Sequence, residues 1–265
     1  MSENLKIYCV TNKRVQHLEK TSLNLVSVGK EKLPDFYLKC NNKDNIYFKE
    51  QYYSELTFHY WYWKNLMNSE KNKWIGFCQK RRIWTEKEIP SKKIDKENIE
   101  NYILKKNNKD WENYEAVICK SINVFPVKKI KMIKRGFRSI VKDPSILFDF
   151  SKQTVLLHFD MHHGHGNLEK AINCLQDRDK VDFYNYVKEK NKFNPNIMYI
   201  ARPEILDKWF TDVFEWLKKC ETIFYTKDLT DYDTGRLFAY LAERYASFWF
   251  KKYTKFYEQP WAVIE

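Results

Sequence analysis

The pattern of apolar and polar positions predicts strands that alternate with helices early in the chain, and mainly helices later. Short apolar runs that are rich in β-branched residues predict buried strands at 5–10, 23–28, 74–78, 114–119 and 154–159. Apolar residues at helical spacing predict helices at 53–67, near 96–105, from 168, at 203–220 and at 234–253. Residues 193–200 are expected to be extended. The pattern therefore indicates an α/β fold with a central mixed sheet, flanking helices and a helical C-terminal part.

Composition supports one large domain in a reducing compartment. The 265 residues are 43% hydrophobic and 17% aromatic, which suffices for a substantial core. The six cysteines are scattered and include no C-x-x-C pair, as expected of a cytoplasmic protein. We find neither an apolar leader nor a membrane-spanning window. The net charge of +12 favours anionic partners.

One aromatic helix and the strand that follows it form a candidate ligand site. Glu55, His59 and Trp63 share a helical face, and the strand at 74–78 leads into Arg81 and Arg82. Charged groups at the carboxyl end of a strand are typical of ligand sites in α/β proteins. The alternative is a core helix beside a core strand, with basic side chains that reach water.

The segment Asp160-Met161-His162-His163-Gly164-His165 is the second candidate for chemistry. Carboxylate and imidazole groups suit a divalent metal, and a metal-dependent hydrolase is one interpretation. However, adjacent imidazoles on an extended chain point to opposite faces, and nothing else in the chain completes a ligand set. We therefore predict no metal ligands here. The other interpretation is that Asp160 or His162 takes the proton from an attacking hydroxyl group.

Seven basic residues and no acid occur between residues 128 and 142. Such a run is either a solvated face or a surface that contacts anionic lipid headgroups or phosphate.

Several segments resemble a known family. The motif E-L-T-x-x-Y-W-x-W-K-N at 55–65, followed by W-I-G-F-C-x-x-R-R at 74–82, resembles the signature of a bacterial glycosyltransferase family. That family occurs in capsule, exopolysaccharide and lipopolysaccharide loci and was long catalogued as a domain of unknown function. Segments 7–11, 196–200 and 236–244 resemble further parts of it, in the same order. Gln79 stands where the family usually has His, and Phe58 where it commonly has Gly.

The resemblance implies a single GT-A-like glycosyltransferase domain, 1–265. Residues 1–125 would form the nucleotide-sugar-binding half, and 126–265 the acceptor-side and helical half. The enzyme would move a sugar from a nucleotide-diphosphate donor to a glycan or lipid-linked glycan acceptor in bacterial surface polysaccharide synthesis. The implied donor-binding residues are Cys9, Val10, Thr11, Glu55, Thr57, Trp61, Lys64, Asn65, Arg81 and Arg82. The chemistry of the segment at 160–165 makes Asp160 and His162 the predicted catalytic residues, with His163 lining the site. The resemblance adds Glu243 as a third catalytic residue, and Asn196, Met198 and Arg244 as acceptor-side or site-lining residues.

Many related transferases carry an Asp-x-Asp metal motif after a central strand, where this chain has Gln79-Lys80-Arg81-Arg82. Guanidinium groups pair bidentately with phosphate oxygens, so we expect Arg81 and Arg82 to neutralise the diphosphate. No cofactor is predicted, and Mn²⁺ or Mg²⁺ is the alternative. Expected partners are the donor, the acceptor and an anionic membrane surface, with the protein peripheral on the inner face of the membrane. A non-enzymatic nucleic-acid-binding protein is the rival interpretation. It lacks a recognised motif, its basic residues are interleaved with 35 acids, and we expect no nucleic-acid partner.

Overall fold

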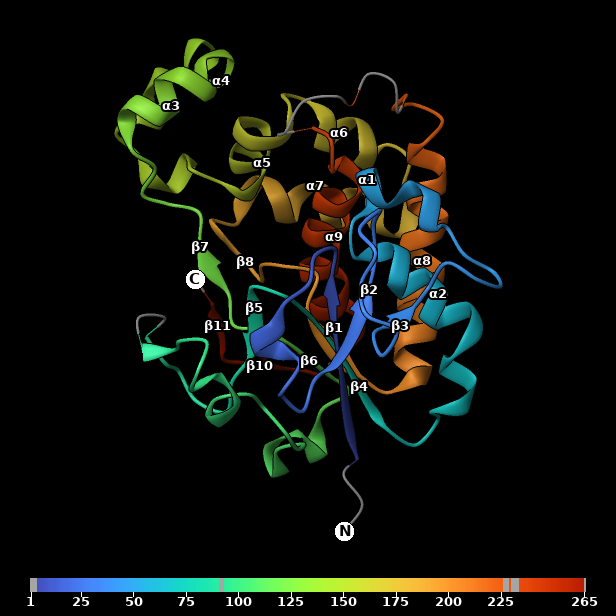
Figure 1. Cartoon of the computed structure of the whole chain (residues 1–265). Helices are drawn as coiled ribbons and strands as arrows, with labels where there is room; N and C mark the ends of the chain where they lie inside the picture. Colours follow the sequence, from blue (N-terminus) through green and yellow to red (C-terminus); the bar gives the residue numbers. More distant parts are fainter. Residues whose placement is uncertain (1–3, 91–92, 226–228, 230–233, 265) are drawn as a thin grey trace. The chain divides into compact units, whose positions relative to one another are not determined.

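The structure is a computed structural model that describes residues 4–90, 93–225, 229 and 234–264 (Figure 1). The chain divides into two compact units, which we describe separately. The sheet unit comprises Met1–Lys120, Asn196–Asp212 and Trp249–Glu265. The helical unit comprises Ser121–Pro195 and Val213–Phe248.

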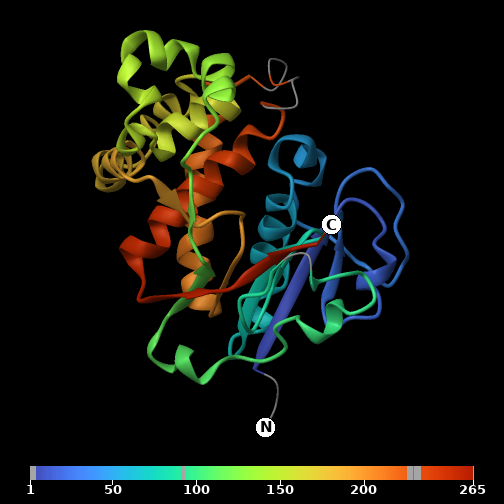
Figure 2. The same ribbon diagram turned by 90° about the vertical axis from the view of Figure 1, so that its left-hand side faces the viewer.

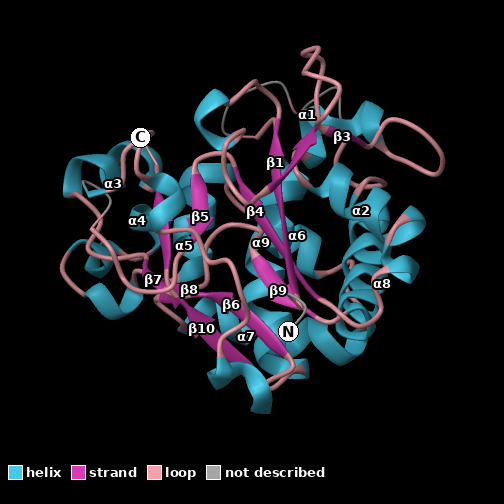
Figure 3. Ribbon diagram, turned by 60° about the horizontal axis from the view of Figure 1, so that its bottom comes forward, coloured by secondary structure: helices cyan, strands magenta, loops and turns pink. Residues whose placement is uncertain are grey.

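In the described part of the sheet unit, nine strands form one mixed sheet (Figure 3). Seven of them follow the order β10-β6-β9-β4-β1-β2-β3. Their bounds are β1 Leu5–Thr11, β2 Asn24–Ser27, β3 Leu38–Lys39, β4 Trp74–Gln79, β6 Ala116–Cys119, β9 Tyr199–Ala201 and β10 Phe256–Gln259. Strands β1, β2, β3 and β4 are mutually parallel, and β9 lies antiparallel between β4 and β6. The remaining two, β5 Arg82–Trp84 and β11 Trp261–Val263, pair antiparallel beside β4, and Figure 2 shows the C-terminal strands in red.

Alternation along β1 gives the sheet two different cores. Ile7 and Cys9 face the hydrophobic cluster below β1, which is mainly aliphatic but also contains Trp74, Trp84 and Trp111. Tyr8 faces the opposite side and packs against an aromatic cluster. That cluster is built from Phe58, His59, Tyr62, Phe77, Tyr199 and Phe210. Each favourable ring pair adds about 0.5–1.5 kcal/mol beyond the burial of its area.

Two helices of the sheet unit precede β4. They are α1 Glu50–Tyr53 and α2 Leu56–Asn65, and they are separated by Ser54, whose φ of 49° interrupts helical geometry. Two long helices, α8 Pro203–Cys220 and α9 Leu237–Tyr253, each run through both units. Short 3₁₀ turns complete the unit: η1 Gln16–Leu18, η2 Tyr47–Lys49, η3 Met67–Ser69, η5 Ile99–Asn101 and η6 Lys109–Asn113.

The helical unit surrounds α5 Val155–His163, which contacts the α3, α6 and α7 helices (Figure 1). Its other elements are β7 Ile122–Asn123, α3 Lys129–Arg135, α4 Phe137–Lys142, η7 Pro144–Leu147, η8 Phe150–Lys152, α6 Asn167–Ile172, α7 Asp177–Glu189 and β8 Lys192–Phe193. The two strands pair antiparallel with each other. Among the described residues, no helix is long and apolar enough to cross a membrane.

The structure confirms the predicted α/β class with a mixed sheet and flanking helices. The predicted strands at 5–10, 23–28, 74–78 and 114–119 are β1, β2, β4 and β6. The predicted helix at 203–220 is α8. The division into a donor half at 1–125 and an acceptor half at 126–265 stays a prediction.

The predicted strand at 154–159 is wrong, because these residues belong to α5. The Thr154 side chain accepts a hydrogen bond from the Leu157 N–H at 3.3 Å and thereby caps the helix. Val155, Leu157, Phe159, Met161 and His163 are buried, since the helix has neighbours on several sides. Burial at every second residue imitates a strand, and periodicity does not separate a short buried helix from a strand.

The predicted helix near residues 96–105 is also wrong, since only the 3₁₀ turn Ile99–Asn101 forms there. The Asp95 carboxylate accepts hydrogen bonds from the backbone N–H groups of Glu97 and Asn98. This local turn competes with helix formation. Ile103 then forms an isolated bridge to Thr85 at the end of β5.

Candidate functional site

The carboxyl ends of β1, β2 and β4 meet at one edge of the sheet unit. The chain passes from β1 to β2 on one side and returns to β4 on the other side. The strand order therefore reverses between β1 and β4, and such a switch point is where open α/β sheets bind ligands. We call this place the switch-point edge.

A polar contact joins the two strands at this edge. The Lys80 ammonium donates a hydrogen bond to Asn12 Oδ1 at 2.6 Å, and the Lys80 N–H donates to the Val10 carbonyl at 3.3 Å. The buried Thr11 hydroxyl turns back to the Lys13 carbonyl at 2.6 Å. These hydrogen bonds hold the residues after β1 close to the residue after β4. Two of the residues involved, Lys13 and Lys80, are lysines.

Glu55, Gln79 and Arg82 form a second set of contacts at the edge. Gln79 ends β4, and its amide donates a hydrogen bond to the Glu55 carboxylate at the start of α2. Arg82 stands opposite Gln79 in the β4–β5 pairing and donates to Gln79 Oε1 at 3.4 Å. All three side chains are half-buried. A carboxylate, an amide and a guanidinium group therefore lie together where β4 ends.

The loop after β2 closes the edge on the other side of β1. Gly29 has a φ of 78°, which an L side chain rarely adopts. A Cβ atom there would lie 3.2 Å from Asn12 Cβ and 3.3 Å from Glu50 Cδ. The Tyr47 hydroxyl donates a hydrogen bond to the Gly29 carbonyl, and burial raises the Tyr47 pKa. The loop is therefore held close to Asn12.

Opposite charges are mixed at this edge. The ends of β1 and β4 and the start of β5 carry the cations Lys13, Lys80, Arg81 and Arg82. The carboxylates come from the helices, as Glu50 and Glu55. Among the described residues, no three His, Cys, Asp or Glu side chains group as a metal site requires. A metal site built from protein ligands alone therefore does not fit the residues at this edge.

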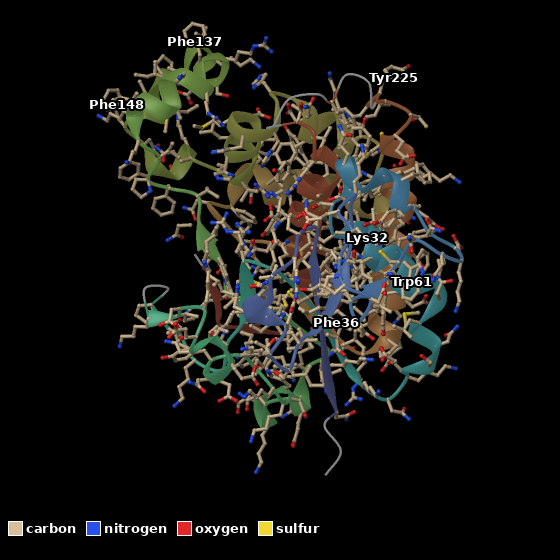
Figure 4. The ribbon with its side chains drawn as sticks, in the orientation of Figure 1. Lys32, Phe36, Trp61, Phe137, Phe148 and Tyr225 are labelled. Carbon is tan, nitrogen blue, oxygen red and sulfur yellow. The ribbon has the colours of Figure 1, made fainter. Side chains whose placement is uncertain are left out.

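The predicted donor-binding residues divide between the two ends of α2. Glu55 lies at the switch-point edge, whereas Asn65 is ten residues further along, about 15 Å at 1.5 Å per residue. Asn65 Nδ2 donates to the Asp44 carbonyl at 2.7 Å, and the Trp61 indole N–H donates to the Asn42 carbonyl at 2.9 Å. Trp61 also lines a groove along β3 with Phe36, and both are labelled in Figure 4. Lys64 Nζ lies 3.2 Å from the centroid of the Trp63 ring.

Most of the other predicted site residues of the sheet unit are buried among core side chains. Cys9 and Met198 lie in the hydrophobic cluster below β1, and Thr57 is fully buried, with its hydroxyl donating to the Ser54 carbonyl at 2.8 Å. Val10 lies buried beside the edge, next to Gln79 in the β1–β4 pairing. Asn196, with a φ of 63°, precedes β9.

In the helical unit, Asp160 lies near the end of α5. Its Oδ1 accepts a hydrogen bond from the Gly166 N–H at 3.0 Å, and its Oδ2 lies 2.9 Å from His165 Nδ1. The side chain is 8% exposed, and burial raises its pKa above the ordinary value. Because α5 is a helix, Asp160 and His162 do not share a face as they would on a strand.

His162 and Arg244 belong to one polar cluster of the helical unit. His162 Nδ1 lies 2.8 Å from the His158 carbonyl, which fixes the proton on Nδ1 and leaves Nε2 as the basic nitrogen of the neutral ring. The fully buried Arg244 donates to His158 Nδ1 at 3.2 Å and forms an ion pair with Glu243. The His163 ring instead stacks on the Tyr240 ring, with 3.7 Å between the ring centroids.

The comparisons with known proteins identify the family. The family described as a domain of unknown function, DUF4422, matches residues 6–255. The chain belongs to the DUF4422 family. Among curated proteins no match was found. Among solved structures, the chain is similar to the apo structure of WbbM, a bifunctional glycosyltransferase.

The likeness to WbbM extends over nearly the whole chain. The TM-score is 0.70 at 17% sequence identity, and the match covers 99% of this chain and 45% of that chain. The DUF4422 chain thus spans less than half of the length of the WbbM chain. At this identity the match shows the fold, which is shared with a glycosyltransferase. The match therefore agrees with the resemblance at the level of the fold.

Sequence reasoning missed several residues that build the switch-point edge of this DUF4422 chain. Asn12, Gly29 and Glu50 were not predicted, and Gln79 was noted only as a departure from the family pattern. Gly29 directly follows an apolar strand, and that signal was present in the sequence. Glu50 offered none, because its place depends on the path of the loop between β3 and α1.

Proposed function

We propose that the chain is a glycosyltransferase that binds a nucleotide-diphosphate sugar at the switch-point edge. The observation that carries the proposal is the cluster of Lys80, Arg82, Asn12 and Gln79 at the carboxyl ends of β1 and β4. It occurs at the ligand-binding position of α/β sheets, in a fold that a known glycosyltransferase shares. The acceptor would be a glycan, and the donor sugar and nucleotide are left open.

The diphosphate leaving group requires positive charge at the switch-point edge. When the acceptor oxygen bonds to the anomeric carbon, the bond from that carbon to the donor phosphate breaks. The diphosphate leaves with the electron pair and gains negative charge. Fixed cations near the developing charge stabilise such a transition state. We assign that role to Arg82, whose guanidinium group matches two phosphate oxygens, with Lys80 as a second cation.

The acceptor hydroxyl must also lose its proton. Asp160 and His162 remain our candidates for the base, and Glu243 is the third catalytic residue that we propose. A buried carboxylate with a raised pKa is a better base than an exposed one. A single displacement with inversion at the anomeric carbon is the simplest course with one such base. His163, Asn196, Met198 and Arg244 stay proposed as acceptor-side or site-lining residues. Met198 and Arg244 are buried, so we assign them no direct contact with the acceptor.

The biological setting is a further part of the proposal. The sequence motifs resemble a bacterial family from capsule, exopolysaccharide and lipopolysaccharide loci. We therefore propose a growing surface polysaccharide, or its lipid-linked precursor, as the acceptor.

The proposal is tested by release of the nucleoside diphosphate from a set of sugar nucleotides, with and without a candidate acceptor glycan. The expected result is acceptor-stimulated release from one donor, and loss of release in the Arg82→Ala protein. Parallel reactions with chelator, and with added Mn²⁺ or Mg²⁺, show which cations the release requires. No release from any donor under any of these conditions would contradict the proposal.

A further inference from the structure

The helical unit exposes an apolar stripe made of residues from the two consecutive short helices α3 and α4. Ile130 and Ile133 lie one turn apart on α3, and Phe137 and Val141 lie one turn apart on α4, on the two sides of the break at Gly136. Each side chain is more than half exposed. Single exposed apolar residues are ordinary, but a contiguous stripe marks an interaction surface. Figure 4 shows Phe137 on the outside of this segment.

The other side of each of these two helices is packed against a cluster that includes residues of α5. Met132 is fully buried in a cluster with Ile146 and Met161, and Ile140 packs against it. A Cβ atom on Gly136 would lie 2.9 Å from the Met132 carbonyl oxygen and 3.4 Å from Met161. The packed side therefore fixes which side faces outward. The outer stripe is not the core-facing side of these helices.

A further apolar ring extends the stripe. Phe148 follows η7 and is 75% exposed, and Lys129 Nζ lies 4.7 Å from the centre of its ring. This contact brings Phe148 beside the beginning of α3. Figure 4 shows Phe148 also directed outward from this part of the chain. We call the five apolar residues and the basic residues between them the apolar–basic surface.

The charges along α3 and α4 are of one sign, whereas Asp143 and Asp149 flank the segment that ends at Phe148, with Asp143 in an ion pair with Lys152. Residues 128–142 contain seven Lys and Arg residues and no acid. Lys134 and Arg138 are exposed next to the apolar stripe. The combination suits a bilayer interface, which accepts apolar side chains to a depth of about 5–10 Å while anionic headgroups attract the cations. A second copy of this chain would present the same positive charge and be repelled.

We propose that the apolar–basic surface docks on an anionic lipid bilayer by inserting its apolar stripe between headgroups. The proposal goes beyond the proposed glycosyl transfer and is independent of it. Attraction by Lys134 and Arg138 brings the surface to the membrane, and insertion of Ile133 and Phe137 retains it there. Both contributions are therefore required for tight binding.

The test is co-sedimentation of the full chain with two kinds of vesicle, phosphatidylcholine alone and phosphatidylcholine with phosphatidylglycerol. We expect binding to the anionic vesicles, weaker binding at high salt, and little binding to the neutral vesicles. The double variant Lys134→Glu, Arg138→Glu should bind anionic vesicles at least about thirtyfold less tightly, given two lost charges. The matched control Lys218→Glu, Lys219→Glu changes two exposed lysines of α8 and should bind nearly as the parent does.

A second pair of variants tests insertion. Ile133→Ser with Phe137→Ser should lower the affinity for anionic vesicles about tenfold or more, because two large apolar side chains no longer enter the interface. The control Val181→Ser with Ile223→Ser alters two exposed apolar residues of the same unit and should have little effect. Thermal unfolding checks that each variant is folded, since exposed substitutions usually change stability by less than about 0.5 kcal/mol.

Several results would overturn the proposal. They are equal binding to neutral and anionic vesicles, no binding to either, and an apolar double variant that binds as tightly as the parent. The last result would leave a charged surface that does not insert. Loss of binding in the control variants to the same extent would also overturn it, because the effect would then not belong to this surface.

Discussion

Replacing Arg82 with alanine removes the half-buried guanidinium group at the switch-point edge and leaves its surroundings in place. Arg82 contacts Gln79 at 3.4 Å, and Gln79 keeps its hydrogen bond to Glu55 when Arg82 is shortened. A loss of ligand binding in the Arg82→Ala protein would therefore report the lost contact to the ligand.

The size of the effect follows from the proposed contact. A hydrogen bond between a charged donor and a phosphate oxygen contributes about 1.5–3 kcal/mol. Affinity for a free nucleoside diphosphate should therefore fall by roughly tenfold to a hundredfold. Affinity for the nucleoside alone should change much less, because it carries no phosphate. Arg82→Lys should recover only part of the loss, since an ammonium group is a point charge without the planar fork.

Isothermal titration of the diphosphate and of the nucleoside measures both affinities. Arg81→Ala is the comparison variant, because Arg81 is also predicted to contact the diphosphate but has an exposed side chain, and its backbone carbonyl accepts from the Ile264 N–H. That bond survives the substitution, and we expect a smaller effect than for Arg82. An Arg82→Ala protein that binds the diphosphate as the parent does would refute the reasoning. So would equal losses for diphosphate and nucleoside.

Three further predictions concern stability and turnover. Phe77→Ala should lower the free energy of unfolding by about 3–5 kcal/mol in urea, because Phe77 is fully buried among aromatic rings, while the exposed Phe36→Ala should change it little. Burial lowers the His59 pKa from 6.5 to about 3, so below pH 6.5 the unfolded chain binds a proton that the folded chain does not. From this group alone, the free energy of unfolding should fall by about 1.4 kcal/mol for each pH unit that the pH is lowered below 6.5. His59→Gln should flatten this pH dependence in urea titrations carried out on both sides of pH 6.5. Asp160→Asn or His162→Ala should lower turnover by roughly two to four powers of ten with the fold retained, and parental turnover in both would exclude them as the base.

The sequence predicted correctly the elements whose pattern of apolar residues depends on their own buried side. It failed where packing against several neighbouring elements sets that pattern. β1 and β4 are apolar runs bounded by polar residues, and α8 has one apolar side, so their patterns were sufficient. The segment at 154–159 was misread because α5 has neighbours on several sides. The pattern carried no information about those neighbours.

The same limit applies to the switch-point edge. A helix beginning at Glu55 and a strand ending near Arg82 were readable from the motif. Their contact through Gln79 depends on the pairing of β1 with β4 and on the path of α2, which are long-range features. The motif also grouped Trp61, Lys64 and Asn65 with Glu55, although helical rise separates Asn65 from Glu55 by about 15 Å. Residues of the same sequence motif therefore lie at different ends of α2 and do not all belong to the switch-point edge.

The central claim is that a nucleotide-diphosphate sugar binds at the switch-point edge. Thermal unfolding of the parent and Arg82→Ala proteins, across a set of sugar nucleotides with and without Mn²⁺ or Mg²⁺, tests this most directly. A ligand that binds only the folded chain raises the unfolding temperature by mass action. We predict that one sugar nucleotide protects the parent and protects the Arg82→Ala protein much less. Protection by none of them under any condition, or equal protection of both proteins, would contradict the claim.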